Sequence, residues 1–186
     1  MPNKQNYRYW SPTKPNIFFE RPLHSPKITV WCGLSANKIY GPYFFEDPET
    51  ELQVTVNSET YLEMLTAMFS ENTYPDEWFQ QDGATAHTSR NVISWLNTRF
   101  SQRLISHKSD FPWPARSPDL SPLDYFLWGF VKEKVFRSAP SNIAVLKNKV
   151  QEVIATIDAN TLQNVVANFV VRIDKCIASN GDHVEC

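Results

Sequence analysis

Apolar and β-branched residues form a continuous run over residues 28–34, and a second run follows over residues 39–45 after a short polar break. A continuous apolar run of this length is typical of a strand that is covered on both faces. The short break between the two runs predicts an antiparallel hairpin. Two shorter runs, residues 78–81 and 104–107, are predicted as further strands.

Between these strands, apolar residues recur at helical spacing. One helix is expected after Ser58, which we take as its N-cap, and a second over residues 89–100. The apolar positions of the two helices are Tyr61, Leu62, Leu65 and Phe69, then Val92, Trp95, Leu96 and Phe100. A hairpin followed by alternating helices and strands predicts an α/β fold, in which strands 78–81 and 104–107 are parallel neighbours joined by a right-handed crossover.

The end of the chain is predicted to be helical. An aromatic helix over residues 123–136 follows a proline-rich segment, and one or two amphipathic helices begin near Ile143, with a break near residues 158–161. The start of the chain carries five of the 13 prolines in residues 1–26 and predicts an extended lead-in. We therefore divide the chain into the lead-in 1–26, a domain over 27–136 and a C-terminal helical extension over 137–186.

Composition limits the classes of protein that the chain can represent. The net charge of -2 lacks the basic excess that a stand-alone nucleic-acid-binding domain usually shows. The three cysteines have no metal-binding spacing, which indicates reduced thiols in an intracellular protein. No apolar run reaches the length of a membrane span, so we expect no membrane partner.

Two aspartates stand where an α/β fold could bring them to a site. Asp82 and then Gly83 follow the strand at 78–81, and Asp124 lies three residues after Ser121 at a predicted helix start. Each has an ordinary structural explanation: Asp82 can close a turn, and Asp124 fits a helix N-terminus with Ser121 as cap. Strand ends beside helix starts are also where ligand sites form, and converging carboxylates bind hard divalent cations. We interpret His87 as a hydrogen-bonding or positioning residue rather than a metal ligand.

Two long motifs carry a resemblance to a known family. "QQDGATAHTSRNV" and "WPARSPDLSPLDYFLWG" resemble the second-acid and third-acid motifs of the mariner-superfamily DDE transposases. The resemblance implies an RNase H-like mixed sheet flanked by helices, with Asp82 and Asp124 as catalytic residues and ligands of Mg²⁺ or Mn²⁺. It further implies that Asp119 belongs to the third motif without binding the metal. DNA at transposon ends is the implied partner, with a possible homodimer and a nuclear location.

The chain departs from the family pattern at its start. In the family the first catalytic aspartate precedes a stretch that resembles "NKQNYRYW" (residues 3–10). We therefore expect the first strand, its aspartate and the DNA-reading helix-turn-helix region to be missing from this chain, and the chain alone to be inactive. Glu20 and Asp47 are the nearest substitutes for the first acid. Three functions stay open: a transposase fragment, a non-enzymatic relic that binds nucleic acid or protein, and an RNase H-like nuclease with a substitute ligand.

Overall fold

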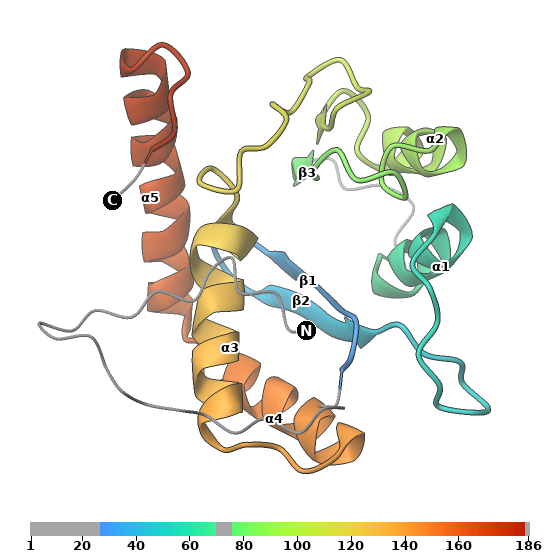
Figure 1. The fold of residues 1–186 in the computed structure, drawn as a ribbon. Coiled ribbons are helices and arrows are strands. Elements are labelled where there is room, and N and C mark those ends of the chain that lie inside the picture. The colour runs from blue at the N-terminus through green and yellow to red at the C-terminus, as the bar shows by residue number, and fades with distance from the viewer. Residues whose placement is uncertain (1–26, 70–75, 185–186) are drawn as a thin grey trace, which may run out of the picture. The chain divides into compact units, whose positions relative to one another are not determined.

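The computed structural model describes residues 27–69 and 76–184 (Figure 1). The predicted lead-in, with the "NKQNYRYW" stretch and Glu20, lies outside the described residues. The elements are β1 (Val30–Leu34), β2 (Ile39–Phe44), α1 (Ser58–Met68), β3 (Phe79–Gln80), α2 (Arg90–Arg99), β4 (Leu104–Ile105), η1 (Leu123–Leu127), α3 (Trp128–Arg137), α4 (Ile143–Ala155) and α5 (Ala159–Ala178). Their order confirms the predicted α/β class.

The strands of the described residues form two two-stranded sheets. Strands β1 and β2 are neighbours in one sheet, and because only residues 35–38 connect them, they must run antiparallel. Strands β3 and β4 pair in parallel, with Phe79 opposite Leu104 and Gln80 opposite Ile105, and α2 lies in the crossover between them. Both predicted pairings are therefore confirmed, although β3 and β4 are shorter than the runs at 78–81 and 104–107.

The chain divides into two compact units. Unit 1 comprises residues 1–42 and 118–186, and unit 2 comprises residues 43–117. The C-terminal helices α4 and α5 thus share a unit with β1 and with the segment that contains Asp124. The division of the chain at residue 136 stays an interpretation from the sequence.

Unit 2 is built around α1 and α2, which pack against each other. Its core includes Met64, Leu65 and Leu96, which are completely buried. One expectation about this unit was wrong: the N-cap of α1 is Asn57, not Ser58. The Asn57 side chain accepts hydrogen bonds from the amides of Glu59 and Thr60, while the Thr60 hydroxyl accepts one from the Asn57 amide. Together these contacts satisfy three backbone donors at the start of α1.

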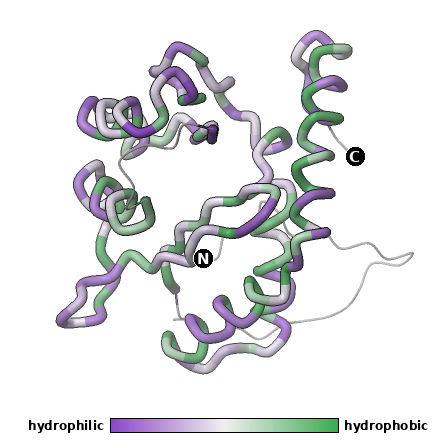
Figure 2. The backbone as a smooth tube through the Cα atoms, turned by 180° about the vertical axis from the view of Figure 1, so that it is seen from behind, coloured by the Kyte–Doolittle hydropathy of each residue, from purple (hydrophilic) through white to green (hydrophobic). Residues whose placement is uncertain are grey.

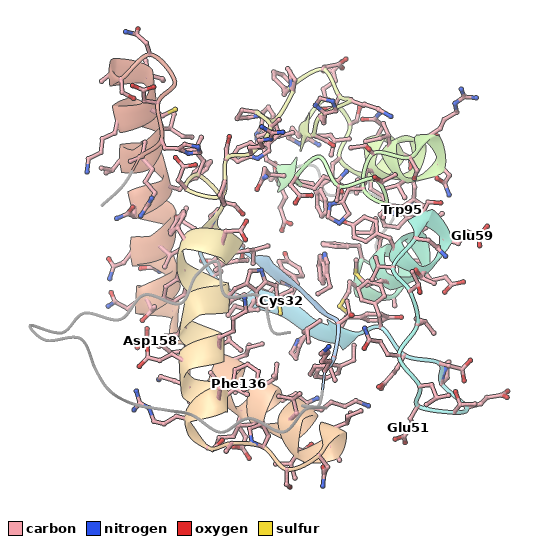
Figure 3. All side chains as sticks on the ribbon, viewed as in Figure 1. Cys32, Glu51, Glu59, Trp95, Phe136 and Asp158 are labelled. Carbon is pink, nitrogen blue, oxygen red and sulfur yellow. The ribbon has the colours of Figure 1, made fainter. Side chains whose placement is uncertain are left out.

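Unit 1 contains the hairpin strand β1, the segment η1–α3 and the two C-terminal helices. The η1 segment packs against β1, and α3 packs against α4. The amphipathic character of α4 and α5 is visible as alternating hydrophobic and hydrophilic bands along each helix (Figure 2). The predicted break between them is confirmed: α4 ends at Ala155, and Asp158, at the start of α5, accepts a hydrogen bond from the Thr161 amide (Figure 3).

Two further findings concern the described part of the chain. None of its helices is both long and apolar enough to cross a membrane. Cys32 lies on β1 (Figure 3) and is buried, and this burial raises the pKa of its thiol to about 12. A thiol with that pKa is protonated at neutral pH and unreactive.

Candidate active site

Asp82 lies immediately beyond β3, at the point where the chain leaves the strand. Its Oδ1 atom accepts a hydrogen bond from the Ala84 amide at 3.1 Å. This hydrogen bond closes a tight turn, which is the structural role that the sequence analysis considered for Asp82. The turn uses one carboxylate oxygen only, so it does not by itself prevent the other oxygen from binding a cation.

His87 holds the same oxygen of Asp82. Its Nδ1 atom lies 2.6 Å from Asp82 Oδ1, and the Asp82 and His87 side chains are 62% and 22% exposed. The hydrogen bond from His87, opposed by partial burial and assisted by the Ala84 amide, keeps the pKa of Asp82 below its ordinary value. Asp82 is therefore ionised at neutral pH and can only accept, so His87 Nδ1 carries the hydrogen of this bond. The predicted hydrogen-bonding role of His87 is confirmed.

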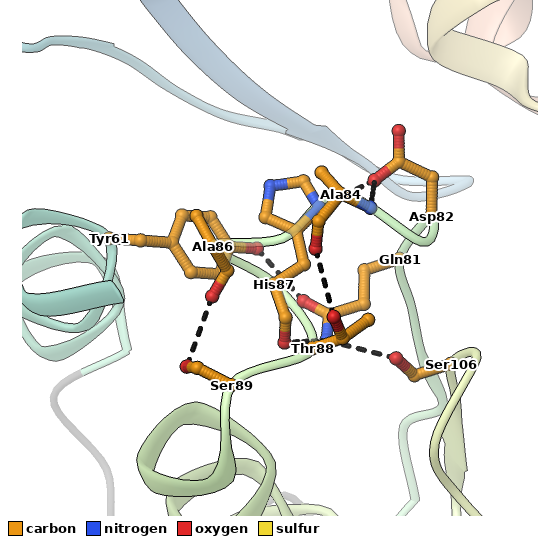
Figure 4. A network of polar contacts seen from close by, with 9 residues as sticks. All are labelled: Tyr61, Gln81, Asp82, Ala84, Ala86, His87, Thr88, Ser89 and Ser106. Carbon is orange, nitrogen blue, oxygen red and sulfur yellow. Dashed lines mark hydrogen bonds and ion pairs between the residues drawn. The ribbon is translucent and has the colours of Figure 1, made fainter. Parts of the chain in front are cut away.

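A buried amide fixes the position of this loop. Gln81 is only 5% exposed, and its side chain makes three hydrogen bonds. Its Oε1 accepts from the Tyr61 hydroxyl at 3.0 Å, and its Nε2 donates to the His87 carbonyl at 2.9 Å and to Ser106 Oγ at 3.1 Å (Figure 4). The His87 ring also lies against the Tyr61 ring, with a centroid distance of 4.3 Å. Gln81 thus ties α1, the end of β4 and the loop after Asp82 together.

The remaining oxygen of Asp82 points away from this network (Figure 4). Among the described residues, Asp82 Oδ2 accepts no hydrogen bond. An ionised carboxylate with one oxygen fixed by donors and the other open suits a hard divalent cation, which prefers oxygen ligands. The Asp82 side chain therefore has the chemistry and the local geometry of a metal ligand.

Asp124 lies in η1, a π-helical turn that opens α3. The amides of Asp124 and Tyr125 both donate to the Ser121 carbonyl, at 2.9 and 3.0 Å. The N-cap of η1 is nevertheless Pro122, with no side-chain cap hydrogen bond, so the predicted cap at Ser121 was wrong. The sequence predicted a regular helix from residue 123, whereas the Trp128 amide donates to the Leu123 carbonyl five residues earlier. Such π-turns are rare and often occur at functional sites. The helical spacing of "LDYFLWG" does not reveal the turn, because contacts far along the chain hold it.

Tyr125, the residue after Asp124, contacts α5 in two ways. Its hydroxyl donates to the Val165 carbonyl of α5 at 2.8 Å, and the Arg172 guanidinium lies over its ring at 4.2 Å. Burial raises the pKa of the Tyr125 hydroxyl to about 12, although the positive charge of Arg172 works in the opposite direction. The tyrosine beside Asp124 is thus a neutral donor that anchors the π-turn to α5.

The other acids named from the sequence lie elsewhere. Asp47 accepts hydrogen bonds from the Glu49 amide, the Thr50 amide and the Thr50 hydroxyl, so its carboxylate closes its own exposed turn. Asp119 contacts residues near the end of the described chain. No group of three or more His, Cys, Asp or Glu side chains able to hold a metal occurs within residues 27–69 and 76–184. Asp82 belongs to unit 2 and Asp124 to unit 1, and their convergence on a metal stays a prediction.

Comparison with known proteins tests the class to which this fold belongs. The solved catalytic domain of Mos1 mariner transposase superposes with a TM-score of 0.67 at 23% identity, over 91% of this chain and 80% of that one. A Mos1 paired-end complex with the left transposon end gives a TM-score of 0.70 at 23% identity, over 96% of this chain and 51% of that one. Other matching Mos1 structures are paired-end complexes with Mn or with Mg. The fold is therefore the RNase H-like fold that the sequence predicted.

The sequence relatives of this chain are transposases. The Tc3 transposase of Caenorhabditis elegans is 26% identical over 187 residues, which cover 95% of this chain and 51% of the relative. The Tcb2 transposase of Caenorhabditis briggsae is 28% identical over 103 residues, or 55% of this chain and 35% of the relative. No family model matches the chain. The chain is homologous to the Tc3 and Tcb2 transposases, and it spans about half the length of the Tc3 transposase.

Proposed function

We propose that this chain is the catalytic part of a transposase that cuts and joins DNA strands with the help of divalent metal ions. The observation that carries the proposal is the state of Asp82, which is ionised, fixed through one oxygen and open at the other. The homology to the Tc3 transposase over nearly the whole chain supports the same assignment. Transposon-end DNA is the proposed substrate, and a homodimer in the nucleus is the proposed setting.

In this proposal Asp82 and Asp124 hold the metal ions. Bound Mg²⁺ or Mn²⁺ would activate the attacking oxygen and stabilise the leaving oxygen of the phosphodiester. The part played by the chain itself is positioning. His87 and the Ala84 amide fix Asp82 Oδ1, which leaves Oδ2 for the metal, and the π-turn η1 sets the direction of Asp124.

The 186-residue chain should bind these ions weakly and should not cut DNA at a measurable rate. It carries two of the three acids that the family uses, and two carboxylates cannot fix a pair of metals for in-line displacement. Effective positioning contributes roughly 7–11 kcal/mol in well-oriented systems. Losing half of this contribution would slow the reaction by about three orders of magnitude, since each 1.36 kcal/mol is a factor of ten.

A chimera tests the proposal. The N-terminal part of the Tc3 transposase, which in this proposal would supply the first acid and the DNA-reading region, is fused ahead of this chain, and nicking of transposon-end DNA is measured with Mn²⁺. We expect metal-dependent nicking that Asp82→Asn and Asp124→Asn each abolish. Asp82→Asn retains an oxygen for the Ala84 turn, so a folding defect is not expected. Asp110→Asn, at an exposed loop position, is the matched control and should nick normally.

Two results would contradict the proposal. DNA cleavage by the unextended chain that survives Asp82→Asn would show that the carboxylates do not carry the chemistry. A chimera that binds transposon-end DNA but does not nick it, although it is folded, would favour a binding relic over an enzyme.

A further inference from the structure

Asp119 lies at the centre of a contact cluster that joins the third-acid motif to residues far along the chain. Its Oδ2 atom accepts a hydrogen bond from the Val184 amide at 2.8 Å, and its Oδ1 atom lies 3.2 Å from His183 Nδ1. The Asp119 side chain is 16% exposed, and Val184 is 6% exposed. We call Asp119, Arg172, His183 and Val184 the Asp119 cluster.

Arg172 completes this cluster from α5. Its Nη1 atom donates to the Asp119 carbonyl at 2.9 Å and to the Val184 carbonyl at 3.3 Å. Its Nε atom donates to Asn168 Oδ1, one turn earlier on α5, which fixes the plane of the guanidinium. The same guanidinium lies over the ring of Tyr125. One side chain therefore contacts the loop before Asp124, the C-terminal segment and the residue that follows Asp124.

The Asp119 cluster differs from an ordinary surface ion pair because its charged side chains bind backbone groups. Most of the hydrogen bonds of Asp119 and Arg172 involve backbone groups, which cannot move without moving the chain. Hydrogen bonds between a charged side chain and a partly buried backbone group are stronger than exposed side-chain pairs. Ser121, whose carbonyl opens the helix, is only two residues from Asp119. A shift of Asp119 would thus be transmitted directly to the first turn of the helix.

We propose that Asp119 and Arg172 are positioning residues for Asp124: they hold the C-terminal segment 182–184 against the third-acid motif and thereby maintain the π-turn that directs the Asp124 carboxylate. A π-turn is an uncommon helical geometry that requires support from its surroundings. Tyr125 contributes to this support through its hydrogen bond to the Val165 carbonyl, and Arg172 contributes through its contact with the Tyr125 ring. The inference concerns the same site as the proposed function and rests on the assignment of Asp124 as a ligand.

Amide hydrogen exchange of the 186-residue chain tests this role without metal or DNA. We expect Arg172→Gln and Asp119→Ala to speed exchange of the amides of residues 123–128 by roughly tenfold or more, because each variant removes hydrogen bonds that involve a charged group. Exchange in α4 should change by less than about twofold, since local openings are independent of the rest of a unit. Arg137→Gln is the matched control, because Arg137 pairs with Glu133 on the exposed surface of α3.

The outcomes separate positioning from general stabilisation. Equal acceleration in residues 123–128 and in α4 would overturn the proposal, because the cluster would then stabilise unit 1 as a whole. No acceleration in residues 123–128 would overturn it as well. If Asp119→Ala does not fold, Asp119→Asn retains one acceptor oxygen for the Val184 amide and should show a smaller acceleration at the same residues.

A second readout connects the cluster to the metal. In the chimera described above, Arg172→Gln should raise the Mn²⁺ concentration required for half-maximal nicking, whereas Arg137→Gln should not. A purely structural defect would lower the folded fraction and leave this concentration unchanged, which would count against positioning. The proposed function would fail separately, through nicking that survives Asp124→Asn, and the exchange result for Asp119 and Arg172 would stand.

Discussion

Replacement of Gln81 by leucine should be the most costly single change in the candidate site. Leucine is close in size to glutamine, so the change removes the hydrogen bonds of the side chain and leaves little empty space. The Tyr61 hydroxyl would lose its acceptor, and the buried Ser106 hydroxyl and the His87 carbonyl would lose their donor. Each buried polar group that loses its partner costs roughly 1–3 kcal/mol. Three such losses give an expected total cost of about 3–9 kcal/mol, a large share of the usual 5–15 kcal/mol of stability.

A double-mutant cycle makes this reasoning specific. Ser106→Ala alone should cost about 1 kcal/mol, because Gln81 Nε2 loses one acceptor. In the Gln81→Leu background the same Ser106→Ala change should be neutral or stabilising, because it removes a buried hydroxyl whose donor is already lost. The free energy of unfolding would be measured by urea denaturation with tryptophan fluorescence, with amide exchange in α2 as the reporter for unit 2.

Two results would refute the assigned role of Gln81. The first is a loss of less than about 1 kcal/mol for Gln81→Leu, since the network would then contribute no more than one ordinary hydrogen bond. The second is a Ser106→Ala cost that is the same in both backgrounds, because the two side chains would then act independently.

Three other predictions concern single positions. His87→Phe, which keeps a ring against Tyr61 but removes the donor, should raise the pKa of Asp82 in a ¹³C NMR titration, whereas His87→Asn should raise it less. Because the folded-state pKa of Asp82 lies below its ordinary 3.8, its stabilising contribution is present above that value and is lost as the pH falls further; His87→Phe should shrink this acid-range dependence. Asn57→Ala should lower the free energy of unfolding by about 1 kcal/mol in urea denaturation. Cys32 should resist a thiol reagent at pH 8 in the folded chain, while the less buried Cys176 reacts.

The sequence predicted the element order and the parallel pairing of β3 with β4 because both follow from local patterns. Apolar periodicity and the positions of the turns depend on neighbouring residues, and these signals are strong at residues 28–45 and 89–107. The break before α5 was predicted for the same reason, since Asp158 is a helix cap recognisable from its neighbours. The sequence also indicated a hydrogen-bonding role for His87, but it did not identify Asp82 as the partner.

The features that were not predicted from the sequence depend instead on contacts between distant residues. Gln81 donates to Ser106, 25 residues away, and Arg172 donates to the Asp119 carbonyl, 53 residues away. A local sequence pattern does not predict pairs that are so far apart along the chain. The available signal for Gln81 was its place in a polar pair, Gln80 and Gln81, at the end of a predicted strand. The π-turn at Asp124 was missed because its support comes from α5. The N-cap of α1 was misassigned by one residue, since Asn57 and Ser58 are both good caps by residue type.

The sequence separation within the Asp119 cluster has a consequence for synthesis of the protein. Asp119 and Val184 are 65 residues apart, and ribosomes add roughly 5–20 residues per second. The segment that carries Asp124 would therefore be made roughly 3 to 13 s before Val184 is added, at that rate of synthesis. Until then Asp119 lacks the backbone amide that holds it, and the π-turn lacks part of its support. The contacts of Asp119 are thus completed only after the far end of α5 has been translated, so a nascent chain would acquire the geometry proposed for Asp124 only after synthesis has passed this point.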